Sequence, residues 1–291
     1  MDWLTVTKLP IGPFAKEAVN WLTTNGKSFF DFLKVILQAG IDAMLYLLQA
    51  PFIASVGGKF AYALFLIAIV TGVSWYFRRS RSVAAFTFFG LLLIVNQGYW
   101  KETTETLALV LAATGVSMVI GVPLGIAAAR RPWFYAILRP VLDLMQTIPT
   151  FVYLIPALIL FGLGMVPGLI ATVIFAIPAP IRLTRLGIIS TPPALVEAAQ
   201  AFGATPMQVL RKVELPFATP QIMAGLTQTI MLSLSMVVIA ALVGAKGLGV
   251  PVVRALNTVN ISMGFEAGLC IVILAIILDR LFRSSGEGEL S

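Results

Sequence analysis

The sequence has 291 residues, of which 59% are hydrophobic and 11% are charged, with a net charge of +7 and a mean hydropathy of +0.96. Because an ordinary soluble domain carries about 25% charged residues, this composition predicts a chain that faces lipid along most of its length. The sequence contains no histidine and one cysteine, Cys270 in an apolar run, which excludes disulfide frameworks, zinc clusters and histidine-based catalysis.

Residues 1–59 are predicted to form an external N-terminal tail with one amphipathic helix, over residues 28–49. The first 28 residues show no continuous apolar segment of the kind found in a signal peptide. The helix has an apolar face (Phe29, Phe32, Leu33, Ile36 and Leu37) and a polar face (Asp31, Lys34 and Gln38). This pattern is typical of a helix on the membrane surface, here the outer leaflet. An eighth span is the alternative, but its charged residues would be costly in hydrocarbon.

Seven segments have the apolar character that a membrane-spanning helix of about 20 residues requires. They are residues 60–77, 83–99, 104–129, 146–163, 166–186, 219–243 and 263–281. The first two, with their connector, form an accessory region over residues 60–103, and the other five form a core over residues 104–283. Residues 284–291 are a cytoplasmic tail. Four prolines are expected to kink the fourth and fifth spans: Pro149, Pro156, Pro178 and Pro180.

The basic residues orient these spans. If the spans alternate in direction, twelve of the 20 Lys and Arg residues fall on one side of the membrane. They are Arg78, Arg79, Arg81, Arg130, Arg131, Arg139, Arg182, Arg185, Arg211, Lys212, Arg280 and Arg283. The positive-inside rule therefore places the N-terminus outside and the C-terminus inside. Topology thus explains the excess positive charge, which does not indicate a nucleic-acid partner.

One long stretch on the inside face, residues 187–218, is predicted to form two short helices. Thr191 is placed to cap the first helix, and Gly203 to end it with a backbone turn that a β-carbon would strain. Thr205 is placed to cap the second helix, with Gln208 at the capping-box spacing. The stretch is therefore expected to form a cytoplasmic helical hairpin.

The hairpin is expected to present a docking face. Pro216 is predicted to stop the second helix before the chain re-enters the membrane. Leu195, Ala199 and Phe202 form an apolar stripe on the first helix, which has no obvious core or lipid to cover it. Such a stripe on a cytoplasmic helix predicts contact with a partner protein. A plain amphipathic hairpin without a partner is the alternative.

Seven residues of this hairpin resemble the EAA loop of ABC-importer permeases. They are Glu197, Ala198, Ala199, Gly203, Val213, Leu215 and Pro216. The resemblance implies that the hairpin sits in a groove of a cytoplasmic ATPase and transmits its closure to the membrane helices. It also implies that ATP is bound by that partner, with no cofactor in this chain. The sequence lacks a phosphate-binding GxxxxGK[ST] loop, which agrees with an ATP site in the partner chain.

The resemblance extends over roughly residues 104–283. Residues 143–188, 232–249 and 270–281 are similar to the ProW-type glycine betaine/proline betaine permease family, including its choline-transport relatives. It implies a non-catalytic, all-α, multi-pass subunit of the bacterial inner membrane that imports quaternary ammonium solutes. Its implied partners are two ATPases, a second permease copy in a homodimer, and an external substrate-binding protein.

Several side chains are candidates for the translocation path, because aromatic faces hold a quaternary ammonium group by cation–π contact. They are Gln146, Thr150, Phe151, Tyr153, Thr229, Ser233 and Met236. The alternative is that the hydroxyls bond to their own backbone and that the aromatic residues pack in the bundle. Pairs of glycines at GxxxG spacing predict close helix contacts: Gly121–Gly125, Gly164–Gly168 and Gly264–Gly268.

Other functional classes fit less well. An ion-coupled secondary transporter usually needs ionisable groups within the membrane, and the centres of the predicted spans hold none. Sodium coupling through backbone carbonyls stays open as an alternative, as does an ABC permease for another small solute. A membrane enzyme would need a nucleophile–base pair or a metal cluster, and a channel would not need the docking loop.

Overall fold

The computed structural model describes residues 10–49 and 51–282, and this part of the chain is helical, without strands. The elements follow one another in this order: α2 (Ile11–Asn25), α3 (Lys27–Gln49), α4 (Pro51–Arg78), α5 (Arg81–Asn96), α6 (Trp100–Arg130), α7 (Pro132–Thr147), α8 (Thr150–Phe161), α9 (Met165–Ala176), α10 (Pro178–Ile189), α11 (Pro193–Ala201), α12 (Pro206–Val209), the π-helix η1 (Leu210–Glu214), α13 (Leu215–Ala241), α14 (Gly249–Thr258) and α15 (Ile261–Phe282). The predicted all-α architecture is confirmed. The predicted cytoplasmic tail lies outside the described residues.

Four helices of the described chain are long and apolar enough to cross a membrane: Trp100–Arg130, Met165–Ile189, Pro206–Ala241 and Ile261–Phe282. They correspond to the third, fifth, sixth and seventh predicted spans. The second of them joins α9 and α10, and the third joins α12, η1 and α13. The first two predicted spans are shorter apolar helices, Ala61–Phe77 within α4 and Arg81–Asn96.

The fourth predicted span, residues 146–163, is not a single helix. Its first residues belong to α7, and α8 begins at Thr150 after a bend of 95°. Ile148 has the extended backbone that the residue before a proline prefers, and Pro149 lacks the N–H that a continuing helix needs. The expected kink at Pro149 is therefore confirmed, and α7 with α8 count as a fifth span only as a bent pair.

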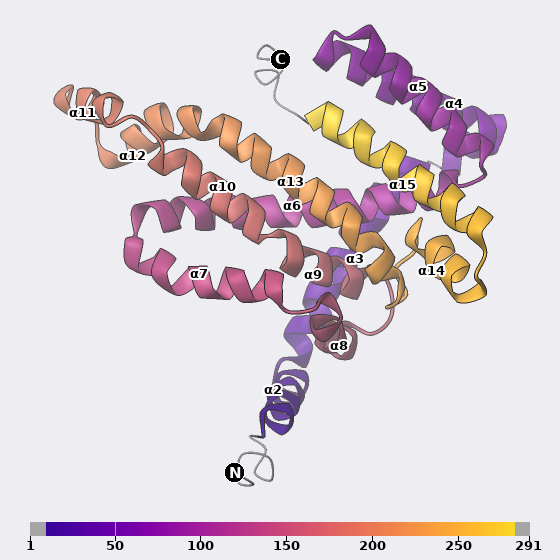
Figure 1. The fold of residues 1–291 in the computed structure, drawn as a ribbon, viewed down its shortest axis with the longest axis horizontal. Helices are drawn as coiled ribbons and strands as arrows, with labels where there is room; N and C mark the ends of the chain where they lie inside the picture. The colour runs from indigo at the N-terminus through magenta and orange to yellow at the C-terminus, as the bar shows by residue number, and fades with distance from the viewer. Residues whose placement is uncertain (1–9, 50, 283–291) are drawn as a thin grey trace.

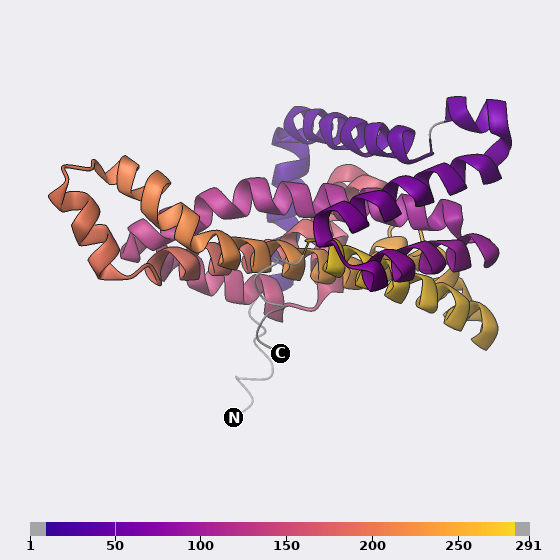
Figure 2. The same ribbon diagram turned by 90° about the horizontal axis from the view of Figure 1, so that it is seen from above.

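The long helices run side by side between two ends of the molecule (Figure 1). One end carries α11 and α12, and the other carries α14. Helix α10 packs against both α6 and α13, and α15 packs against α13 and α5. In the view turned by 90°, α3 and α4 lie on one side of this layer of helices (Figure 2). The four long apolar helices thus lie together, and α3 packs on them from the N-terminal side of the chain.

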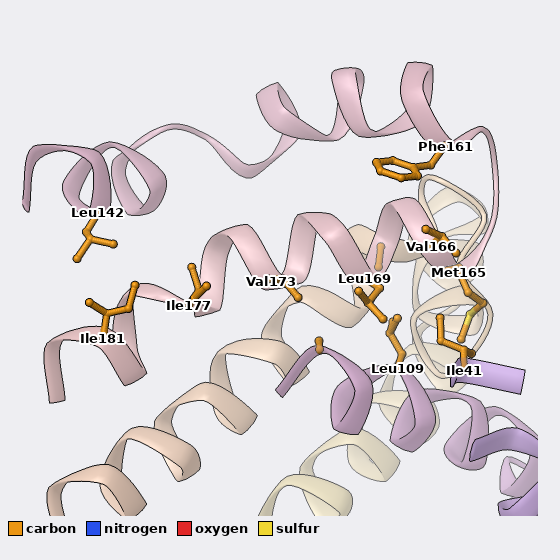
Figure 3. Close-up of a cluster of buried hydrophobic side chains, with 13 residues drawn as sticks. Ile41, Leu109, Leu142, Phe161, Met165, Val166, Leu169, Val173, Ile177 and Ile181 are labelled. Atoms are coloured by element: carbon orange, nitrogen blue, oxygen red, sulfur yellow. The ribbon is translucent and has the colours of Figure 1, made fainter. Parts of the chain in front are cut away.

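The largest buried apolar cluster is built around α9. Its residues Met165, Val166, Leu169 and Val173 face Leu109 of α6 and the neighbouring helices (Figure 3). Helices α3, α7 and α8 each add a buried side chain to this cluster, namely Ile41, Leu142 and Phe161. The short helix α9 is therefore enclosed by protein. Its residues are apolar on all sides, which suits a helix whose every face packs against other helices.

Glycines let α6 and α10 approach closely. A β-carbon at Gly121 would lie 2.8 Å from the ring of Pro180, and one at Gly125 would lie 2.7 Å from the carbonyl oxygen of Ile181. The contact predicted from this GxxxG pair is confirmed. Gly168 likewise faces α13 and the chain that follows it, whereas Gly268 has open space around it within the described chain. Gly264 lies against Ala255 of α14, where a β-carbon would be at an ordinary contact distance of 3.5 Å, and Gly164 has no such neighbour. The second and third pairs thus make a contact at one glycine each within the described chain.

Helix α3 divides its apolar residues between two surfaces. Leu33 and Leu37 pack against the α9 cluster, and Phe30 stacks edge-on against Phe161 with ring centroids 5.6 Å apart. By contrast, Phe29 and Phe32 of the predicted apolar face are more than 60% exposed. One edge of the predicted apolar face therefore packs on the bundle, and the rest of it is uncovered within the described residues; its contact with the outer leaflet stays a prediction.

Candidate coupling loop and translocation path

The predicted cytoplasmic hairpin is present as α11 and α12, at the end of the molecule away from α14 (Figure 1). Phe202, at the end of α11, is 93% exposed, and Leu195 is 48% exposed. Glu197 and Ala198 are exposed and Ala199 is half-buried. The predicted docking residues therefore form a surface that the described part of the chain leaves uncovered.

A backbone motif at Gly203 sets the turn between α11 and α12. Gly203 has a φ of +77°, in the left-handed region that favours glycine. Its N–H donates to the carbonyl of Gln200 at 2.9 Å, and the N–H of Ala204 donates to the carbonyl of Ala199 at 3.1 Å. These two bonds form a Schellman motif, which satisfies the carbonyls at the end of α11. The predicted turn at Gly203 is confirmed.

The capping predictions had different outcomes. Thr205 and Gln208 form both bonds of the capping box, with the N–H of Thr205 donating to Gln208 Oε1 at 2.7 Å. The cap predicted at Thr191 was wrong: α11 begins at Pro193, with Pro192 at the cap position. Thr191 is buried in the connection from α10, and its hydroxyl has no partner within the described residues.

Pro216 does not stop the second helix. Residues Pro206–Ala241 form one continuous helix that carries the loop directly into the membrane span. The π-helical turn Leu210–Glu214 lies just before the proline, and the N–H of Leu215 bonds to the carbonyl of Leu210. In a π-turn each N–H bonds to the carbonyl five residues earlier instead of four. The regular α-helical bonding is thus already interrupted just before Pro216, so the N–H that proline lacks does not end the helix. The loop and α13 are thus one mechanical element.

The hairpin is fastened to α6 by Arg130, the last residue of that helix. Arg130 Nη2 donates to Glu214 Oε2 at 2.6 Å and to the carbonyl oxygen of Pro206 at 3.1 Å. Glu214 is only 14% exposed, so water screens this ion pair incompletely. The sequence analysis used Arg130 only as a topology signal. In the sequence, the feature that could have pointed to this ion pair is Glu214, an acidic residue that follows the basic residues Arg211 and Lys212.

Replacing Arg130 with glutamine is expected to loosen the α12–η1 turn. The ion pair is partly exposed, so its loss should cost about 1 kcal/mol, which corresponds to roughly fivefold faster hydrogen exchange over residues 206–214. Mass-spectrometric hydrogen exchange on the detergent-purified protein would measure it. Arg131→Gln is the matched control, because Arg131 is exposed and forms no ion pair within the described residues. Equal exchange in both variants would contradict the assignment.

A second set of polar contacts holds α7 to α10. Arg182 donates to Asp143 Oδ1 at 2.6 Å and to Gln146 Oε1 at 3.1 Å. The guanidinium of Arg185 lies over the ring of Tyr135, 3.6 Å from its centroid. Gln146, a candidate for the translocation path, is therefore part of a helix-to-helix contact. The bent α7–α8 pair is anchored at its α7 end.

The other path candidates come from two helices, α8 and α13. Tyr153 of α8 packs against a buried cluster to which α9 contributes Ala171 and α13 contributes Met236. Thr229 is buried and donates to the carbonyl of Gly225 at 2.6 Å, which is the backbone bonding weighed above. Ser233 is buried, and its hydroxyl has no partner within the described residues. Phe151 is 55% exposed, and Thr150 is half-buried at the start of α8.

Comparison with known proteins agrees with this geometry. Residues 121–285 match the family model described as "Binding-protein-dependent transport system inner membrane component". The chain is 44% identical to the glycine betaine transport system permease protein OpuAB of Bacillus subtilis, over 95% of this chain and 94% of that one. It is 45% identical to the glycine betaine/carnitine transport permease protein GbuB of Listeria monocytogenes, over 96% of each chain.

A third permease and a solved ABC transporter structure are also similar to this chain. The glycine betaine/proline betaine transport system permease protein ProW of Escherichia coli is 41% identical, over 100% of this chain and 84% of that one. Among solved structures, a chain of the MetNI methionine ABC transporter in inward-facing conformations aligns with a TM-score of 0.58 and 26% identity. That alignment covers 64% of this chain and 94% of the other.

Proposed function

The chain belongs to the binding-protein-dependent transport system inner membrane component family, and from this premise we propose that it is the permease subunit of an ATP-binding-cassette importer for quaternary ammonium solutes. Glycine betaine heads the solute class, because it appears in the names of the three relatives that align along nearly the whole chain. The chain is a multi-pass protein of the bacterial inner membrane. The observation that carries the proposal is the exposed α11–α12 hairpin, which continues into a membrane-spanning helix.

The importer has an ATPase and a substrate-binding protein as partners. We assign ATP binding and hydrolysis to the ATPase, and none to this chain. Two copies of the permease would pair as a homodimer above two ATPases, because a two-fold pair is the commonest closed assembly of identical chains among soluble oligomers. The external binding protein would deliver the solute to the opposite end, where α14 lies. These copy numbers belong to the proposal.

The geometry supports a specific route for the mechanical signal. Closure of the ATPases on ATP would move α11 and α12 towards the partner copy. Because Pro206–Ala241 is one helix, this motion would pass along α13 without a flexible joint. Arg130 would carry it at the same time to α6 through Glu214 and the carbonyl of Pro206. The paired bundles would then rock and open to the outside.

Reconstitution tests the proposal. The permease, its ATPase and its binding protein would be placed in proteoliposomes, and uptake of labelled glycine betaine and choline followed with and without internal ATP. We expect uptake only with ATP, with the solute preference set by the binding protein. Uptake without ATP that follows a sodium or proton gradient would instead identify a secondary carrier.

A further inference from the structure

Helix α14 lies at the end of the molecule opposite the coupling hairpin (Figure 1). Its residues help to line a charged pocket of about 260 Å³. It forms where the start of α6, the α13–α14 connection and α14 meet. Helix α6 contributes Lys101, Glu102 and Glu105 to its lining, and the connection and α14 contribute Lys246 and Arg254, with Tyr99 beside them. Ligand sites for drug-sized molecules usually measure about 300–1,000 Å³, so this pocket suits a smaller molecule.

Two carboxylates in the pocket lack partners. Glu105 is 6% exposed, and within residues 10–49 and 51–282 its carboxylate forms no hydrogen bond or ion pair. Glu102 Oε2 is buried and also has no partner in this part of the chain. A buried carboxylate is costly unless a cation or a hydrogen-bond donor satisfies it. Two carboxylates without a direct partner therefore share the pocket with three basic side chains, so the pocket offers groups for both a cation and an anion.

The walls of the pocket are held rigidly. The N–H of Leu248 donates to Thr106 Oγ1 at 2.8 Å, which fastens the α13–α14 connection to α6. Gly247 has a φ of +124°, and a β-carbon there would lie 2.5 Å from the same oxygen. The N–H of Lys246 contacts Met165 Sδ at 3.1 Å, so the connection is also fixed to α9. The charged side chains thus project from a preformed frame.

We propose that this pocket binds a small zwitterion with a permanently cationic head and a carboxylate. Glu102 and Glu105, with the Tyr99 ring, receive the cationic head, because carboxylates and aromatic faces both attract a quaternary ammonium group. Arg254 and Lys246 receive the carboxylate of the solute. The assignment rests on the proposed function and adds to it a receiving site at the outer end of the path.

Binding to the permease alone tests the pocket. Equilibrium dialysis would follow labelled glycine betaine and labelled choline with the purified full-length chain in lipid nanodiscs, without binding protein. Glu105→Gln is expected to weaken binding of both solutes by about tenfold or more, since both carry the cationic head. Arg254→Gln is expected to weaken glycine betaine by a similar factor and leave choline unchanged, because choline has no carboxylate. Glu17→Gln, on exposed α2, is the control.

The outcomes separate this inference from the proposed function. If the wild type imports glycine betaine with ATP but Glu105→Gln binds both solutes as well as the wild type does, the pocket assignment is overturned and the importer stands. Absence of saturable binding to the wild-type chain also overturns the pocket. If the wild type shows no ATP-dependent uptake of either solute, the importer assignment fails on its own. Glu102→Gln provides a second test should Glu105→Gln not fold.

Discussion

Replacing Glu197 with lysine is expected to abolish ATP-dependent uptake while the membrane bundle stays folded. Glu197 is exposed on α11 and forms no ion pair within the described residues, so its carboxylate is free to meet a basic group of the ATPase. A like charge placed against such a group costs several kcal/mol, which predicts a loss of uptake on the order of a hundredfold. Uptake of labelled glycine betaine into proteoliposomes would measure it, with ATPase binding followed in parallel.

Two companion variants make this test specific. Glu197→Gln removes the charge without introducing repulsion, and we expect a loss of roughly tenfold. Glu17→Lys makes the same charge reversal on exposed α2, away from the hairpin, and should leave uptake unchanged. Wild-type uptake in Glu197→Lys would show that α11 does not dock on the ATPase through this residue. Equal losses in both lysine variants would indicate a general effect of charge.

Replacing Gly203 with valine is expected to uncouple ATP hydrolysis from uptake. A non-glycine residue in the left-handed region costs about 1–2 kcal/mol, and a β-branched side chain is the least suited to it. The α11–α12 turn would then adopt other conformations, and uptake should fall by about tenfold per ATP hydrolysed. The midpoint of thermal unfolding should change little, because the turn lies outside the membrane bundle and can relax its backbone strain without a clash with neighbouring atoms.

Asparagine at the same position provides the control. Asparagine tolerates the left-handed conformation better than other residues with a side chain, and the site has room for it. Gly203→Asn should therefore retain most of the uptake that Gly203→Val loses. If both variants lose uptake equally, the turn conformation is not the cause. If both variants unfold at a lower temperature than the wild type, the turn contributes to the stability of the membrane bundle and not to coupling.

Features decided by neighbours in the sequence were predicted well. The capping box of Thr205 and Gln208 and the left-handed turn at Gly203 depend on bonds that span three to five residues, so the local pattern sufficed. The kink at Pro149 has the same origin, because a proline acts on its own turn and on the residue before it. The long apolar helices could likewise be read from composition and length alone.

Features decided by helix packing were missed. Thr191 has the side chain of a cap, but the connection from α10 buries it and α11 begins two residues later. Pro216 has the chemistry of a helix stop, but a π-turn before it lets one helix continue into the membrane. For α3, the periodicity showed which residues are apolar and could not show that two stripes have different neighbours.

The sequence by itself determined that the chain is a helical membrane protein, which end is basic, and which hairpin is exposed, because these depend on composition and on local bonding. Only the tertiary structure decided how the hairpin is connected to the bundle. Arg130 and Glu214 are separated by 84 residues and meet because α6 and the coupling helix end side by side. The outer pocket likewise needs α6 and the α13–α14 connection to be brought together, and Thr106 meets Leu248 across 142 residues. No local pattern encodes such a meeting, since it follows from how the helices pack.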